Sequence, residues 1–256
     1  MDYLSLEISG SIAYLTINRP EKRNAFNQQM WRNLPKLLAK AVQANTRCLI
    51  LQASGDKAFC AGADIDELTV MIKDKTELKV NNQYIQEAQQ ALAVLPIVTI
   101  ALINGACMGG GLGLAMACDF RIAANHAKFA ITPAKLGLLY SIADTKRVYE
   151  LVGLSRAKEL LMLSKVLDAA TAVDYGLINQ QCELDQLTDR GEELCQQVLL
   201  NSGYSQRGIK LTLNQISGEQ QVTVQQLDDL FIDAFDGDDF NEGAAAFLEK
   251  RKPKFC

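Results

Sequence analysis

Two short segments rich in glycine and alanine contain the residue types best suited to chemistry on a carbonyl group. They are residues 58–65, AFCAGADI, and residues 104–111, NGACMGGG. Each stands where an apolar, strand-like run gives way to a helix-like pattern. Residues this small let the backbone approach a ligand closely and leave peptide N–H groups directed outward. Two such turns side by side would aim two N–H donors at one oxygen, which is an oxyanion hole.

The elements that must position these turns alternate between strands and helices. Apolar runs predict strands at residues 5–9, 12–18, 47–53, 97–103, 119–123, 128–131 and 177–183. Helical spacing of apolar residues predicts helices at residues 27–44, 64–71, 77–95, 112–117, 142–152, 156–163 and 185–200. From about residue 206 onward only helical periodicity remains, including residues 224–235 and 241–250. The pattern predicts an α/β core over residues 1–200 and a helical region over residues 201–256.

Composition limits the classes of function. The 256 residues are 48% apolar and 22% charged, which is typical of a soluble globular protein. A net charge of -4 argues against a nucleic-acid partner. We see neither a bilayer-spanning run nor a signal peptide, so we expect a cytoplasmic protein without a membrane partner. The 7 cysteines form no CxxC pair and His126 is the one histidine, which predicts reduced thiols and no metal site.

Further segments connect the two turns to a known family. Residues 18–27 (NRPEKRNAFN), residues 117–123 (ACDFRIA) and residues 242–255, together with the turns, resemble the crotonase (enoyl-CoA hydratase/isomerase) family. The resemblance covers essentially the whole chain in order. It implies a spiral of β-β-α units, a C-terminal helical trimerisation region, and a homotrimer or a dimer of trimers. It also implies an acyl-CoA thioester substrate, with coenzyme A entering as part of the substrate rather than as a cofactor.

The resemblance also assigns roles to individual residues. The oxyanion-hole N–H groups would belong to Ala63 and Gly110, which would hold the thioester oxygen as enolate-like charge develops. The residues implied to bind coenzyme A are Lys22, Arg23, Ala25, Phe26, Ala61, Asp64, Ile65 and Lys250, the last across a subunit boundary. The alternative is structural: glycines 109–111 would only allow tight packing, and the lysines would only solvate the surface.

The usual acid and base of the family are missing. Hydratases of this family hold two glutamates that position and activate a water molecule. One of those positions is Gly113 here, and the other falls on Pro133 or Ala134, depending on how ITPAKLG is aligned. None of the three is a carboxylate, so the mechanism of water addition by two glutamates is not supported.

Two side chains just after this stretch are the remaining candidates for proton transfer, Tyr140 and Asp144. The run from Thr132 to Tyr140 resembles methylmalonyl-CoA decarboxylases of the same superfamily, in which a tyrosine at that position lies in the active site. Tyr140 would then protonate an enolate after loss of CO₂. In the structural alternative, Tyr140 packs beside the acyl tunnel, while Ser141 and Asp144 form a helix-capping pair.

Three functions therefore stay open. The first is a lyase or isomerase of the enoyl-CoA hydratase/isomerase group with a non-standard acid and base, for which Asp66 and Glu67 are further candidate carboxylates. The second is an acyl-CoA decarboxylase that uses Tyr140. The third is a catalytically silent protein that binds coenzyme A thioesters.

Overall fold

A computed structural model describes residues 3–255, which form two β-sheets and ten α-helices. The strands are β1 (Leu4–Ser9), β2 (Ile12–Ile17), β3 (Cys48–Ala53), β4 (Ala58–Cys60), β5 (Val98–Ile103), β6 (Ala106–Met108), β7 (Phe120–Ala124), β8 (Lys128–Ala130), β9 (Leu167–Asp168) and β10 (Gln180–Cys182). The helices are α1 (Gln28–Gln43), α2 (Ile65–Met71), α3 (Lys75–Ala93), α4 (Gly110–Ala117), α5 (Ile142–Met162), α6 (Ala169–Asp174), α7 (Leu187–Leu199), α8 (Gly203–Ser217), α9 (Val224–Asp233) and α10 (Asp238–Leu248).

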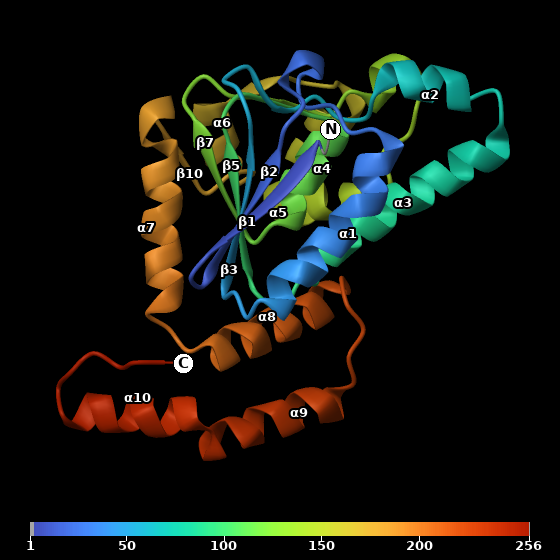
Figure 1. Ribbon diagram of the computed structural model, residues 1–256. Coiled ribbons are helices and arrows are strands. Elements are labelled where there is room, and N and C mark those ends of the chain that lie inside the picture. The colour runs from blue at the N-terminus through green and yellow to red at the C-terminus, as the bar shows by residue number, and fades with distance from the viewer. Residues whose placement is uncertain (1–2, 256) are drawn as a thin grey trace.

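The larger sheet has six strands in the order β1-β2-β3-β5-β7-β10. Strands β1 and β2 form an antiparallel hairpin, and every later neighbour in the sheet is parallel. Helices α1 and α3 lie on one side of it and α7 on the other (Figure 1). Because both faces are covered, β3 and β5 are nearly continuous apolar runs rather than alternating ones. This layering confirms the expected α/β class.

The smaller sheet brings the two glycine turns together. Its order is β4-β6-β8-β9, and β4 runs parallel to β6 with Ala58 opposite Ala106. Parallel neighbours end at the same edge of a sheet, so the segments that follow β4 and β6 emerge side by side. A helix starts directly after each turn, α2 after the first and α4 after the second. The two turns are thus positioned by strand pairing.

Some predicted elements differ from the observed ones. Helix α5 covers both predicted helices, but Gly153 interrupts it with φ 75° and ψ 168°, close to the predicted gap. The last strand, β10, is shorter than predicted because Leu177 and Ile178 are buried in the core before pairing begins. Strands β4, β6 and β9 were not separated from their surroundings by the sequence, since they have three residues or fewer and show no measurable period.

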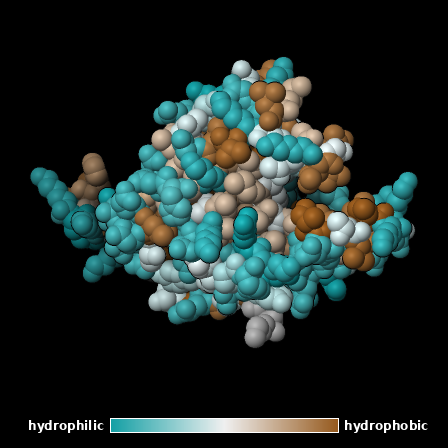
Figure 2. All heavy atoms as spheres, turned by 90° about the horizontal axis from the view of Figure 1, so that it is seen from above, coloured by the Kyte–Doolittle hydropathy of each residue, from teal (hydrophilic) through white to brown (hydrophobic). Residues whose placement is uncertain are grey.

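The last three helices lie below the larger sheet in Figure 1, with α9 and α10 farthest from it. Helix α9 has no buried residue, and large apolar side chains on these helices are exposed, among them Phe231 at 65% and Phe247 at 83%. The view from above shows apolar side chains interrupting the polar surface at the other end of the molecule too (Figure 2). A role of the last helices in trimerisation remains a prediction. No helix within residues 3–255 is long and apolar enough to cross a bilayer.

Candidate active site

The two glycine turns are in van der Waals contact. A Cβ on Gly62 would lie 3.3 Å from the Gly110 nitrogen and 3.1 Å from the Met108 carbonyl oxygen. Gly62 also has φ +100°, a backbone conformation that side-chain-bearing residues rarely adopt. Glycine is therefore required at position 62 for the turns to approach each other.

Among residues 3–255, the N–H of Ala63 has no acceptor because of the way its segment pairs. Ala63 forms an isolated parallel bridge with Phe26. Both bonds of that bridge use the Phe26 backbone: its N–H donates to the Gly62 oxygen at 2.8 Å, and its oxygen accepts from the Asp64 N–H at 2.9 Å. The peptide N–H of Ala63 takes part in neither bond. The bridge therefore fixes the direction of the Ala63 N–H and leaves that N–H without a hydrogen bond to the bridge.

The N–H of Gly110 also has no acceptor in the described part of the chain, because Gly110 is the first residue of α4. The first N–H groups of a helix have no partner inside the helix and carry the positive end of its dipole. Gly109 precedes it as the N-cap with φ 49° and ψ -119°. The Phe26 ring packs on Trp31 with centroids 4.4 Å apart, and Trp31 lies against Gly110. The same core pair thus supports both N–H groups.

A carboxylate lies beside Gly113, one of the positions at which the family's glutamates are missing. A Cβ on Gly113 would lie 2.8 Å from the Asp144 Oδ1 and even closer to the Gln89 amide. Asp144 comes from α5 and Gln89 from α3, so two neighbouring helices fill the space that a side chain on α4 would take. With its amide in the orientation that satisfies both groups, the Gln89 nitrogen donates to both Asp144 oxygens at 3.1 Å.

Asp144 is buried, with 3% of its surface exposed. The Ser141 hydroxyl donates to its Oδ2 at 3.0 Å, and Arg147 donates to its Oδ1 at 3.2 Å. Burial raises the pKa of Asp144 above its usual 3.8, although Arg147, Ser141 and Gln89 each favour the charged form. Ser141 does cap α5 by accepting from the Asp144 N–H. The capping interpretation is thus correct for Ser141, while the Asp144 carboxylate points into the buried cluster.

Tyr140 reaches the same turn of α4. Its hydroxyl donates to the Gly109 carbonyl oxygen at 2.9 Å. Burial of the hydroxyl and the nearby charge of Asp144 raise the pKa of Tyr140 well above 10.0, so the phenol stays protonated in neutral solution. The two proton-transfer candidates and the Gly110 donor therefore meet on one helical turn, residues 109–113.

The other two carboxylate candidates have structural partners. Asp66 is exposed and pairs with Lys22 at 2.8 Å. The Glu67 Oε2 accepts from the Gln28 N–H at 2.7 Å, which satisfies a donor in the first turn of α1. Neither carboxylate contacts the turn formed by residues 109–113.

All but one of the residues expected at coenzyme A lie on two segments that pair with each other, the loop before α1 and the first glycine turn. The Arg23 carbonyl accepts from the Ala61 N–H at 3.0 Å, which ties the loop before α1 to that turn. Lys22, Arg23 and Ile65 are exposed, whereas Phe26 is 1% exposed and contributes only its backbone. The side chains of Lys22, Arg23 and Ile65 are therefore the groups of this set that face solvent, whereas the Phe26 peptide groups are bonded to Gly62 and Asp64.

The Asp64 carboxylate already bonds to other groups of the same chain. It caps α2 and accepts from Arg19 Nη1 at 2.7 Å. Burial alone would raise the pKa of Asp64, but the bonds from Arg19 and from the N–H groups of Glu67 and Asp66 outweigh it and lower the pKa. Lys250 follows α10 at the other end of the molecule from α2 (Figure 1), so within one chain it does not join this group.

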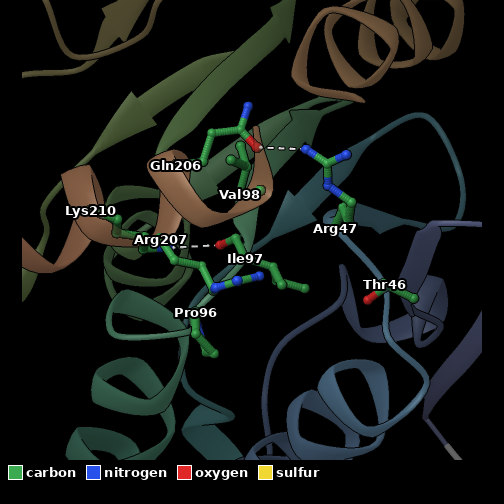
Figure 3. A pocket seen from close by; sticks show the side chains of 9 residues that line it. Thr46, Arg47, Pro96, Ile97, Val98, Gln206, Arg207 and Lys210 are labelled. Carbon is green, nitrogen blue, oxygen red and sulfur yellow. Dashed lines mark hydrogen bonds between the residues drawn. The ribbon is translucent and has the colours of Figure 1, made fainter. Parts of the chain in front are cut away.

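A separate small pocket of about 20 Å³ lies at the opposite ends of the parallel strands, where β3 and β5 begin. Figure 3 shows Arg47, Arg207 and Lys210 around it. Lys210 donates to the Ile97 oxygen at 3.0 Å and to Asp119 at 2.8 Å. Asp119 also accepts from the N–H and the hydroxyl of Thr99, so its carboxylate has a structural role. This pocket is not part of the candidate active site.

Sequence reasoning missed Gln89 and Arg147. Arg147 stands three residues after Asp144 on α5, a spacing that brings two side chains together on a helix and was available as a signal. Gln89 had no such signal, because its contact with Asp144 depends on how α3 packs against α5.

The sequence profile of the enoyl-CoA hydratase/isomerase family matches residues 7–256. The mitochondrial methylglutaconyl-CoA hydratase of Mus musculus is 34% identical over 259 residues, covering 97% of this chain and 81% of that protein. The 1,2-epoxyphenylacetyl-CoA isomerase of Escherichia coli is 32% identical over 264 residues, covering 100% and 98%. The crystal structure of an enoyl-CoA hydratase/isomerase family protein from Hyphomonas neptunium superposes with a TM-score of 0.94 at 33% identity, covering 99% and 97%.

Proposed function

This chain belongs to the enoyl-CoA hydratase/isomerase family, and we propose that it moves a proton beside the carbonyl of an acyl-CoA thioester. Within that chemistry, we propose that it shifts the double bond of an enoyl-CoA, with Asp144 as the base. The observation that carries the proposal is the position of the Asp144 carboxylate against Gly113, three residues along α4 from the Gly110 N–H.

The oxyanion hole is proposed to consist of the N–H groups of Ala63 and Gly110. Both are unused within the described chain and belong to turns in contact with each other. Fixed donors stabilise an enolate because they need no reorganisation as the charge develops on the oxygen. The loop residues around the first turn would hold coenzyme A, and Lys250 would reach it from a neighbouring copy in a trimer.

Asp144 suits isomerisation better than hydration. As a carboxylate it would remove a proton from the carbon next to the carbonyl of a 3-enoyl-CoA. It would return that proton two carbons farther along, which moves the double bond into conjugation. One base is enough for both steps, whereas water addition in this family employs two glutamates, and this turn has one carboxylate. Burial makes the Asp144 carboxylate a stronger base than an exposed one.

A second candidate function is decarboxylation of a malonyl-type thioester, which the contacts of Tyr140 favour. The substrate carboxylate would leave as CO₂, its bonding electrons would become the enolate, and the Tyr140 O–H would protonate carbon and be reprotonated by water. The raised pKa of Tyr140 keeps this proton in place at neutral pH. However, that O–H already donates to the Gly109 oxygen, so we rank this function second.

Turnover of a thioester panel in D₂O, followed by mass spectrometry, tests the proposal. The panel contains 2-enoyl, 3-enoyl, 3-hydroxyacyl and malonyl-type members, and the variants are Asp144→Asn, Tyr140→Phe and the exposed control Asp66→Asn. We expect double-bond movement with deuterium uptake, reduced about 100- to 10,000-fold by Asp144→Asn alone.

The other outcomes contradict this assignment. Loss of CO₂ that Tyr140→Phe abolishes and Asp144→Asn preserves would establish the decarboxylase. Hydration indifferent to Asp144 would refute its role as the base. Tight thioester binding without turnover of any member would identify a silent binding protein.

A further inference from the structure

The buried partner of Asp144 is shared with a second carboxylate. Arg147 Nη1 donates to Asp144 at 3.2 Å, while its Nη2 contacts Glu219 Oε1 directly. Arg147 is 5% exposed and the Glu219 side chain 10%, so water screens these contacts little. Glu219 belongs to the segment between α8 and α9, far from Asp144 in sequence.

Helix α3 holds both ends of this chain of charges. Gln89 donates to the Asp144 carboxylate. The next residue, Gln90, donates from its Nε2 to the Glu219 carbonyl oxygen at 2.6 Å, and its Oε1 accepts from Arg147 at 3.5 Å. Two consecutive side chains on one helix therefore fix the relative positions of Asp144, Arg147 and Glu219.

The groups that face Asp144 come from each neighbouring element. Helix α3 presents the uncharged Gln89, α4 presents the backbone of Gly113, and the segment before α5 presents the Ser141 hydroxyl and the Tyr140 phenol. Within residues 3–255, the one oppositely charged group bonded to Asp144 is Arg147. Whatever competes for Arg147 thus changes how strongly Asp144 holds a proton.

We propose that Glu219 is a positioning residue that acts on Asp144 through Arg147. This inference rests on the proposed role of Asp144 as the base. Glu219 divides the hydrogen bonds and charge of Arg147 between two carboxylates, so Asp144 is held in place without being fully neutralised. If Glu219 were uncharged, Arg147 would pair with Asp144 alone, and Asp144 would become a weaker base.

The experiment compares Glu219→Gln with Glu150→Gln and Glu219→Asp. Glu150 lines the same cavity of about 190 Å³ as Arg147 and Glu219 but pairs with Lys146, so its substitution removes the same charge without freeing Arg147. The first readout is the titration of Asp144 by carbon NMR on protein labelled at the aspartate carboxyl, with the signal assigned by its absence in Asp144→Asn. The second is the pH profile of turnover.

We expect Glu219→Gln to move the Asp144 titration and the acidic limb of the pH profile to lower pH, and to lower the plateau rate by less than about tenfold. Glu150→Gln and Glu219→Asp should leave both near the parent values. An unchanged Asp144 titration in folded Glu219→Gln would overturn the inference, whatever the reaction is. A shifted titration together with full turnover by Asp144→Asn would instead refute the proposed function and leave the coupling intact.

Discussion

Replacement of Gly110 by proline removes one proposed oxyanion donor at a helix position where proline is favoured. Gly110 is the first residue of α4, and proline is favoured at the first position of a helix because the N–H there has no intrahelical partner. A Cβ at Gly110 would lie 3.6 Å from Trp31 Cζ2 and 3.8 Å from the Ala63 nitrogen, which is ordinary van der Waals contact. Gly109 has no Cβ, so the usual clash between proline and the preceding residue is reduced.

The expected loss is at least that of the donor, because the proline Cδ replaces the amide hydrogen and also takes space where the thioester oxygen would bind. Removing one oxyanion-hole donor costs about 100- to 1000-fold in rate, or about 2.7–4 kcal/mol in transition-state stabilisation. Gly110→Ala is the matched control, because it adds the same Cβ and keeps the N–H. We expect its kcat/KM to stay within about tenfold of the parent, since the added atom meets no close contact.

Two assays separate the donor from the fold. The first is kcat/KM with the best member of the thioester panel, accompanied by thermal unfolding of each variant. The second is the absorption spectrum of a conjugated enoyl-CoA bound to the protein, which moves to longer wavelength when its carbonyl is polarised. If folded Gly110→Pro matched Gly110→Ala in both kcat/KM and spectral shift, the hypothesis that the Gly110 N–H is an oxyanion donor would be refuted.

Three further predictions concern stability. Because burial holds the pKa of Asp144 above 3.8, its ionisation costs folding free energy, so Asp144→Asn should gain stability relative to the parent as pH rises from 3.8 toward neutrality in urea unfolding. Asp64 behaves oppositely, because Arg19 lowers its pKa against the effect of burial. Asp64→Asn should be less stable than the parent above pH 3.8, and this difference in unfolding free energy should vanish as pH falls through the native pKa of Asp64. A Cβ on Gly111 would lie 2.6 Å from the Cys60 Cβ, so Gly111→Ala should lower the free energy of unfolding by about 1–3 kcal/mol. An unchanged midpoint of denaturant unfolding would contradict that contact.

The parts of the fold that the sequence predicts are the elements long enough for their apolar residues to show a helix or strand periodicity. Helices α1, α3 and α7 and strands β3 and β5 lie close to their predicted positions, because each carries enough apolar residues to define a period. The three-residue strands β4 and β6 exist through their pairing with each other, which no local pattern encodes. Their pairing nevertheless has the consequence that the sequence did suggest, namely two glycine turns in contact.

The charged part of the candidate site was less accessible to sequence reasoning. In the sequence, Asp144 is distinguished only by following a segment that resembles known enzymes. Its contact with Gly113 depends on how α5 packs against α4, and its bond with Gln89 depends on α3. Glu219 lies farther still along the chain and reaches Arg147 only in the folded state. Pairings of this kind are set by tertiary packing, which a single sequence does not display.

The backbone N–H groups of the candidate site could be predicted from the sequence and its carboxylate largely could not, and this difference has a physical cause. A backbone N–H can be aimed only by the conformation of its own turn, so the proposed oxyanion hole requires small residues at fixed places such as Gly62 and Gly110. A carboxylate, in contrast, can reach the same point from any element packed around it. At Gly113 the two solutions exclude each other, since even a Cβ there would collide with Asp144 and Gln89. Glycine at position 113 is therefore the structural condition for the Asp144 carboxylate to lie there, and the proposed base takes the space that a glutamate at position 113 would need.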